Sequence, residues 1–433
     1  MKHSIFALIL LSFVSLLFGA NLHYTLYKKE SNNGPVMLII GGIHGNEPGG
    51  YYAPQVFLKK YSITYGNVWI VPNLNFDSII ANQRGIYGDM NRKFASIDRN
   101  DKDFAIVSDI KKTIVDPSVD IILNLHDGHG FYRQRYINGL LNPNSWGQAY
   151  IIDQKILHGA NKFGNLDEMA RRVSKNASVS LIEESHEFNV KNTDTKTKDK
   201  DMQKSLTYFA IRSGKPAFAV ETSKNITDTA TKVLYQLKSL EEFMNATGIK
   251  FTRNFDLSIP EINKILAQNG FIRFNKSNTI LPLDDLKDKN SFVPIAQGDT
   301  SYSSETPLVG IKTIPNVIGI YNGSKKLGYI QTVPAQMDNS LKEIEITSNG
   351  VVSKTKLAQI IPIHSPFKIT VPSGYRVNVI GFTHNKYNDE NGVEITKQKI
   401  DKRYSVDKSA NCYRVEFYKG TSYCGNIIVQ FDK

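Results

Sequence analysis

The sequence VMLIIGGIHGNEPGG, residues 36–50, is the clearest indicator of fold class in this chain. Its apolar residues 36–40 lead into a glycine-rich loop that carries His44 and Glu47. Near-continuous hydrophobicity predicts a strand that is buried on both faces of a sheet. Helix-like stretches alternate with such runs from 35 to about 243, which predicts an α/β domain whose sheet is largely parallel or mixed. The similar runs are VWIVPNLN (68–75), VDIILNLHDG (119–128) and PAFAVETS (216–223).

The glycine-rich loop pairs a histidine with a carboxylate at a spacing that suits a metal. His44 and Glu47 are three residues apart, although such a pair alone is also typical of a surface loop. Open α/β sheets bind ligands beyond the carboxyl ends of their strands, and His126 ends the run 119–128. Two imidazoles, one carboxylate and an open fourth position form a catalytic zinc set. We prefer His126 to His129 as the third ligand because it directly follows the apolar run.

Other polar residues near the predicted strand ends suit hydrolysis. Glu221 ends its own apolar run and is a candidate base that takes a proton from water and passes it to a leaving group. The segment QRGIYGDMNRKF (83–94) holds Arg84, Asn91 and Arg92. Guanidinium forks bind carboxylates bidentately and also stabilise an oxyanion, so two arginines could divide these tasks. Taken alone, the arginines would fit a basic surface loop equally well.

The order and spacing of these residues resemble the motif set of the zinc metallocarboxypeptidase family. The resemblance covers residues 35 to about 245. It implies a mixed α/β sheet flanked by helices, one catalytic Zn²⁺ and hydrolysis of a C-terminal amide bond. The implied roles are zinc binding by His44, Glu47 and His126, polarisation of the scissile carbonyl by Arg84, binding of the terminal carboxylate by Asn91 and Arg92, and general base and acid catalysis by Glu221.

Two aromatic positions bear on the substrate pocket. Trp146 follows the third ligand in an aromatic segment and is predicted to line the pocket, with core or surface contacts as the alternative. Digestive members of the family use a tyrosine in a loop before the glutamate. Tyr208 is not assigned to that role, so the substrate lid is the point where the chain departs from the family. The charge-rich stretch 190–204 predicts a solvated loop or the start of a helix.

The amino terminus predicts export. Lys2 precedes an apolar run from Ile5 to Phe18 and the small pair Gly19-Ala20, which predicts a signal peptide over residues 1–20 and a periplasmic mature protein. An uncleaved anchor is the alternative, but the run is shorter than a comfortable bilayer span, which favours the signal peptide. The formal net charge of +12 favours an anionic partner. Because the chain is exported, we expect neither a nucleic-acid partner nor a membrane span after cleavage.

After the α/β domain, predicted for residues 21–247, the pattern becomes short alternating segments broken by Gly, Pro, Asn and Ser. These segments predict a small β domain over residues 248–338 and a β-sandwich of immunoglobulin-like type over residues 339–433. The only cysteines, Cys412 and Cys424, flank the turn signal KGTS. They are predicted to lie on a hairpin, either as a disulfide or as two unpaired thiols.

This architecture is similar to that of the peptidoglycan D,L-carboxypeptidases that determine cell shape in helical epsilonproteobacteria. The resemblance implies removal of meso-diaminopimelate from the muramyl tripeptide by cleavage of its bond to the γ-carboxyl group of D-glutamate. Two other functions are open. One is a deacylase like aspartoacylase or succinylglutamate desuccinylase, whose zinc loop also resembles GIHGNE but which is usually intracellular. The other is a cell-wall binding protein without activity, against which the intact set of ligands, arginines and glutamate argues.

Overall fold

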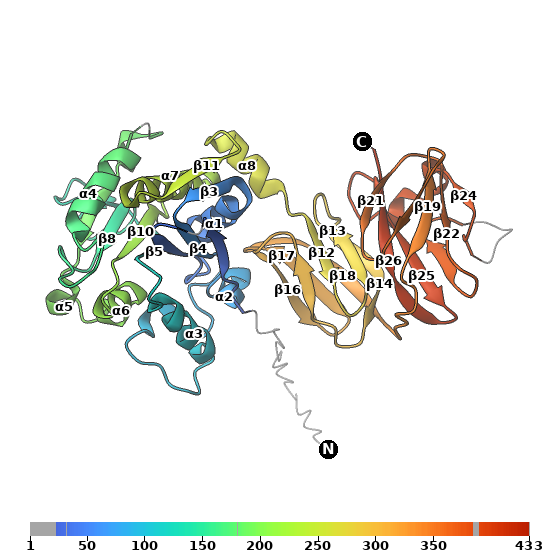
Figure 1. The fold of residues 1–433 in the computed structure, drawn as a ribbon, viewed down its shortest axis with the longest axis horizontal. Helices are drawn as coiled ribbons and strands as arrows, with labels where there is room; N and C mark the ends of the chain where they lie inside the picture. Colours follow the sequence, from blue (N-terminus) through green and yellow to red (C-terminus); the bar gives the residue numbers. More distant parts are fainter. Residues whose placement is uncertain (1–22, 32, 180, 384–388, 433) are drawn as a thin grey trace, which may run out of the picture.

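The computed structural model describes residues 23–31, 33–179, 181–383 and 389–432. The signal peptide predicted for residues 1–20 lies outside the described residues. Figure 1 shows three parts that follow one another along the chain, an α/β part and then two parts built from strands. Within the described ranges, every helix is too short or too polar to span a bilayer.

A seven-stranded mixed sheet forms the centre of the α/β part. All four apolar runs become neighbouring parallel strands at its middle, as predicted, because side chains on both faces are covered. Strand β1 (Tyr27–Glu30) is antiparallel to its neighbour, and strand β8 (Ala149–Ile152) is antiparallel to the last of the four, which makes the sheet mixed. The order is β1 (Tyr27–Glu30), β4 (Asn67–Val71), β2 (Val36–Ile40), β5 (Ile121–Gly128), β10 (Ala217–Ser223), β8 (Ala149–Ile152) and β9 (Asn189–Asn192).

Helices cover both faces of this sheet. α1 (Pro48–Lys60) and α7 (Thr229–Thr247) contact each other and reach β5 and β10, and α4 (Leu166–Ala177) contacts α7. In the view of Figure 1, α3 (Phe104–Ile114) and α6 (Leu206–Arg212) lie below the sheet and α7 lies above it. The first turn of α1 runs close to β5, since a Cβ atom on Gly50 would meet the Leu125 carbonyl oxygen at 2.6 Å. Only glycine allows this approach, which brings the loop before α1 next to the end of β5.

The α/β part extends beyond the boundary predicted at residue 247. β11 (Lys250–Arg253) pairs with β3 (Tyr61–Tyr65), and Ile262 and Ile265 of α8 (Ile259–Ala267) join the α/β core. Residues 259–267 are therefore a helix, whereas the sequence places them in the small β domain. An amphipathic helix of this length is easily missed because it lies next to segments with strand-like alternation.

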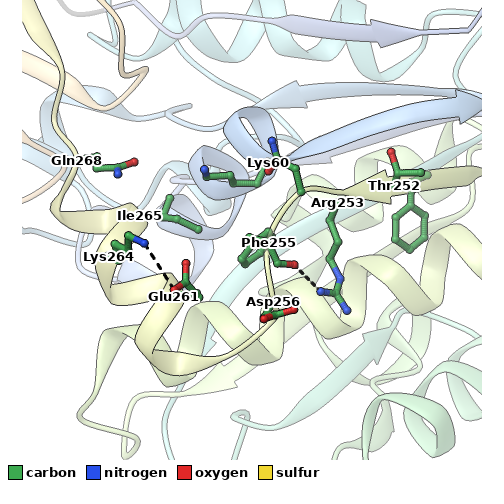
Figure 2. Close-up of a pocket in the computed structure, with 11 residues that line it drawn as sticks. Lys60, Thr252, Arg253, Phe255, Asp256, Glu261, Lys264, Ile265 and Gln268 are labelled. Carbon is green, nitrogen blue, oxygen red and sulfur yellow. Dashed lines mark hydrogen bonds and ion pairs between the residues drawn. The ribbon is translucent and has the colours of Figure 1, made fainter.

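A hollow lies between β11 and α8, and Figure 2 shows the residues that line it. The Arg253 guanidinium donates a hydrogen bond to the Phe255 carbonyl oxygen at 2.7 Å and pairs with Glu241 at 3.1 Å. Lys264 and Glu261 lie 3.8 Å apart. These charged groups therefore neutralise one another within the protein.

The middle β part contains two sheets around one apolar core. It also contacts the α/β part directly, since the Tyr52 hydroxyl donates to the Asn322 carbonyl oxygen at 2.8 Å. One sheet consists of β13 (Thr279–Pro282), β12 (Phe271–Phe274) and β15 (Tyr302–Ser304). The other consists of β14 (Lys289–Ala296), β18 (Lys325–Ala335), β17 (Val317–Asn322) and β16 (Val309–Ile314).

The last part is a sandwich of two four-stranded sheets whose inner faces share one apolar core. The first sheet has the order β20 (Val351–Thr355), β19 (Ile344–Ser348), β22 (Phe367–Thr370) and β24 (Glu394–Ile395). The second has the order β21 (Ile360–Ile363), β26 (Ser422–Phe431), β25 (Cys412–Lys419) and β23 (Arg376–Val379). The buried Asn426 side chain bonds both backbone groups of Ile280, which ties the sandwich to the middle part.

The two cysteines lie on the predicted hairpin as unpaired, buried thiols. Cys412 contributes to the core of the middle part, whereas Cys424 contributes to the core of the sandwich. Cys424 lies at the register irregularity between the pairs Phe417–Gly425 and Tyr418–Tyr423, where strict alternation of side chains is broken, so the two thiols belong to different cores. Of the two alternatives that the sequence left open, the structure has the unpaired thiols.

Candidate active site

A pocket of about 330 Å³ lies at the carboxyl ends of the central strands. All eight residues predicted from the sequence line it, although they come from widely separated segments of the chain. The pairing of β10 with β5 brings Glu221 directly beside His126. The eight residues are His44, Glu47, Arg84, Asn91, Arg92, His126, Trp146 and Glu221.

Three buried side chains converge on one point in this pocket. Nδ1 of His44 lies 3.0 Å from one Glu47 carboxylate oxygen, and Nδ1 of His126 lies 2.9 Å from the other. The two Nδ1 atoms are 3.2 Å apart. His129 also lines the pocket, but it is not part of this donor group. Two imidazole nitrogens and a carboxylate at one point fit a catalytic divalent metal, so His44, Glu47 and His126 form the metal-binding triad.

Asp89 is the main site residue that the sequence reasoning missed. One of its carboxylate oxygens lies 2.9 Å from Nε2 of His44, and the other accepts a hydrogen bond from Nε of Arg84 at 2.9 Å. The same side chain caps the short turn Met90–Arg92 by accepting from the backbone N–H of Asn91. Burial raises the pKa of Asp89, but His44 and Arg84 outweigh it and leave that pKa below its usual value. Asp89 therefore orients a metal ligand and an arginine together.

We expect Asp89→Asn to weaken metal binding by about 10- to 100-fold, the usual effect of removing a partner behind a ligand. Asparagine keeps an oxygen that can cap the turn but loses the charge that orients the His44 ring. Competition with a colorimetric chelator measures the affinity. Asp288→Asn, at an exposed carboxylate in the middle part, is the matched control. If Asp89→Asn binds metal as tightly as Asp288→Asn and the wild type do, Asp89 does not contribute to metal binding.

The two arginines occupy different places in the pocket. Arg84 Nη1 donates to the Glu47 carboxylate at 3.2 Å, so this guanidinium lies beside the metal-binding triad. Arg92 Nη1 donates to the Asn91 carbonyl oxygen at 3.1 Å. The Asn91 side chain in turn accepts from the Leu206 backbone N–H at 2.9 Å, which fixes its loop to the start of α6. Arg84 is thus placed next to the metal site, and Asn91 and Arg92 share one anchored loop.

Glu221 has the environment of a proton-transfer residue. Its side chain lines the pocket, and the residue is only 9% exposed. Burial first, and then the carboxylates of Glu47 and Asp127, raise the pKa of Glu221 well above its usual value. A raised pKa makes a carboxyl group a better proton acceptor than an ordinary glutamate, and the same group can return the proton later in the reaction.

Asp127 lies behind the metal site and was also not predicted. Its carboxylate accepts from the Gly49 backbone N–H at 3.0 Å and from the Thr222 hydroxyl, and Lys232 Nζ lies 3.7 Å away. These contacts join the end of β5 to the first turn of α1. They therefore hold Glu47, at the start of α1, in its position toward the histidines.

The outer wall of the pocket contains Trp146 and part of the charge-rich stretch 190–204. Lys191 Nζ lies 4.2 Å from the Trp146 ring centroid, and burial lowers the pKa of Lys191 to about 8. Met202 also lines the pocket. Tyr208 is buried within α6, and no tyrosine is among the pocket-lining residues in the part of the chain that the structure describes. The stretch 190–204 therefore borders the site, and no family-type lid tyrosine is found there.

A mixed α/β sheet with this donor triad, two arginines and a buried glutamate defines a metallocarboxypeptidase. The catalytic model of a family described as carboxypeptidases controlling helical cell shape matches residues 3–267. A second model, described as the C-terminal domain of metallo-carboxypeptidase, matches residues 337–432. The chain belongs to the family of carboxypeptidases that control helical cell shape.

Solved structures agree with this assignment. The apo structure of the cell shape determinant protein Csd4 from Helicobacter pylori is 33% identical and aligns with a TM-score of 0.88, covering 94% of this chain and 100% of that chain. The tripeptide-bound structure of the same protein matches equally well. Its mDAP-bound form, described as a D,L-carboxypeptidase, is 35% identical over the same coverage, with a TM-score of 0.88. No curated protein matched the chain.

Proposed function

We propose that this chain is a periplasmic zinc D,L-carboxypeptidase that shortens the muramyl tripeptide of peptidoglycan to a dipeptide. It would release meso-diaminopimelate and thereby affect cell shape. The observation that carries this proposal is the convergence of the His44, Glu47 and His126 donors beside Glu221. The relative that binds tripeptide and mDAP supports the substrate, since it aligns over 94% of this chain.

The deacylase alternative has less support. The second family model matches the sandwich, and the alignment with Csd4 covers 94% of this chain, so the similarity is not confined to the zinc loop. An inactive wall-binding protein is also disfavoured, because all eight predicted residues remain together in one pocket.

In the proposed mechanism, Glu221 moves the protons. A Zn²⁺ ion at the triad would supply Lewis-acid activation of water and of the scissile carbonyl. Glu221 takes a proton from the attacking water as the new C–O bond forms. It then gives that proton to the amide nitrogen as the C–N bond breaks, so that the amino acid leaves as an amine.

The arginines act on the two oxygen groups of the substrate. In this proposal Arg84, which contacts Glu47, stabilises the negative charge that develops on the carbonyl oxygen. Arg92 and Asn91, which line the pocket, bind the free carboxylate next to the scissile amide, so we expect substrates without a free carboxyl end to be poor. Trp146 forms part of the wall against which the stem peptide would lie.

Zinc and the periplasm are parts of the proposal with separate support. The nitrogen and oxygen donors favour Zn²⁺, although other divalent ions bind such sets according to their availability. Export is supported by the signal-like residues 2–20, and the basic charge of the chain suits an anionic wall polymer.

We expect Arg92→Ala to raise KM for the tripeptide by about tenfold or more, because a charge-assisted bond to the substrate carboxylate is lost. Steady-state kinetics on muramyl tripeptide measure this effect. Arg99→Ala, at an exposed arginine of the same region, is the control. Unaltered KM in the Arg92 variant would mean that another residue binds the carboxylate.

The substrate class is tested with muramyl tripeptide, tetrapeptide and pentapeptide supplied separately. The proposal predicts release from the tripeptide. Release from the longer stems alone would contradict it, and so would turnover of an N-acyl amino acid without turnover of any stem peptide.

A further inference from the structure

The α/β part and the middle β part share an apolar cluster where they meet. Leu308, directly before β16, is its member from the middle part and has no exposed surface. It packs against side chains of α1 and α2 (Phe76–Ala81), and Figure 1 shows α2 beside β16 at this junction. Because a fully buried leucine occupies the junction, the two parts are docked on each other and not merely connected. The cluster residues from the helices are Tyr51, Phe76, Ile79 and Ile80.

Hydrogen bonds around the cluster fix how the two parts are oriented. The Tyr51 hydroxyl lies 3.0 Å from Oγ of Ser324, and the Asn73 side-chain amide donates to the Pro307 carbonyl oxygen at 3.1 Å. Tyr52 adds the bond to the middle part described above. Hydrogen bonds are directional, so three of them at separate positions define an orientation as well as a contact.

The helix α2 also packs directly against the loop that carries His44. A Cβ atom on Gly45 would overlap the Ser78 carbonyl group, so this loop lies on the backbone of the helix. On the other side of His44, the Gly42 carbonyl oxygen accepts from the Asn75 backbone N–H, at the start of α2, at 2.9 Å. The loop is therefore fixed to α2 both before and after the metal ligand.

The same two helices support Glu47 and Arg84. The Ile86 backbone N–H donates to the Ser78 hydroxyl at 3.0 Å, which ties the segment of Arg84 to α2. Glu47 directly precedes α1, and Tyr51 of the junction is the fourth residue of that helix. Because α2 has only six residues, it is too short to be stable by itself and depends on tertiary contacts. Contacts with the middle β part therefore help to hold the metal-binding loop.

We propose that Leu308 is a positioning residue for the metal site. By packing on α1 and α2, it holds the loop 41–47 in the conformation that brings His44 and Glu47 toward His126. The middle β part then contributes to metal affinity, although the pocket-lining residues that the structure describes all come from the α/β part. The inference goes beyond the proposed reaction, since it concerns the metal site alone and holds for any substrate.

Zn²⁺ affinity of the full mature chain tests this role. We expect Leu308→Ala to weaken Zn²⁺ binding by about tenfold in competition with a colorimetric chelator, because the cavity allows α2 and the loop to shift. Leu281→Ala is the matched control, since Leu281 is equally buried but belongs to the core of the middle part. It should bind Zn²⁺ as the wild type does, at a temperature where thermal unfolding shows both variants to be folded. Leu308→Met, which keeps the side-chain volume, should restore the affinity.

Hydrogen–deuterium exchange of the metal-free chain gives a readout that does not use the metal. Leu308→Ala should speed exchange of the amides of residues 41–47, whereas Leu281→Ala should speed exchange only within the middle β part. Equal Zn²⁺ affinity in the two alanine variants, or unchanged exchange of residues 41–47 in Leu308→Ala, would overturn the proposal. If Leu308→Ala does not fold, the same comparisons are made with Leu308→Val, which leaves a smaller cavity.

The result is separable from the catalytic assignment. Neither Zn²⁺ affinity nor amide exchange requires a substrate. If the wild type fails to cleave muramyl tripeptide, the proposed function fails, whereas these two measurements still decide whether Leu308 positions the metal-binding loop.

Discussion

Glu221→Gln is expected to lower kcat by about 10²- to 10⁴-fold, the usual contribution of a positioned general base and acid. Glutamine has nearly the same shape but can neither take the proton from water nor return it to the leaving amine. The metal-binding triad does not include Glu221, so the variant should retain its metal and its fold. Steady-state turnover of tripeptide, metal content and thermal unfolding are measured on the same preparation.

The pH profile gives a second readout of the same residue. Glu221 must be deprotonated to accept a proton, and its pKa is raised. The activity of the wild type should therefore be low at pH values below the pKa of Glu221 and should increase as the pH rises through that pKa. Glu183→Gln, at an exposed glutamate, is the control and should keep the wild-type profile. A Glu221→Gln variant with wild-type turnover would remove this residue from the mechanism.

His126→Ala is expected to abolish both stable metal binding and activity. It removes one of three converging donors, leaving His44 and Glu47 as a two-ligand site, whereas catalytic zinc sites use three protein ligands. Loss is measured as metal content after dialysis against a weak chelator, alongside tripeptide turnover. Because the ligand is buried, thermal unfolding should be followed to separate metal loss from collapse of the fold.

His129→Ala is the matched control for this change. The two histidines are three residues apart and both line the pocket, but His129 is outside the donor group. We expect its metal content to match that of the wild type. The opposite pattern, with metal lost from His129→Ala and retained in His126→Ala, would contradict the assignment of the triad.

The central sheet and the eight site residues could be predicted because each depends on local pattern. Continuous apolar runs predict buried parallel strands, and polar residues at the ends of such strands lie at one sheet edge. His126 was distinguishable from His129 for this reason, since it directly follows its strand. The site roles remain predictions that the variants above test.

Other features depend on contacts between distant segments, which local pattern does not reveal. Asp89 supports His44 from 45 residues away. Its sequence signal, an acidic residue two positions before Asn91, is no stronger than that of an ordinary turn. Met202 reaches the pocket from a stretch whose composition indicates only solvent exposure. Helix α8 extends the α/β part because Ile262 and Ile265 pack in the core of that part. The sequence of the helix alone does not indicate which core it contacts.

Metal-dependent cleavage of the stem peptide can be measured by incubating the purified mature protein with muramyl tripeptide, with and without a chelator, and following the products by mass spectrometry. We expect release of diaminopimelate and a dipeptide stem, loss of that release in chelator, and recovery when Zn²⁺ is restored. Intact tripeptide in the zinc-loaded reaction, or release that chelator does not affect, would contradict this expectation.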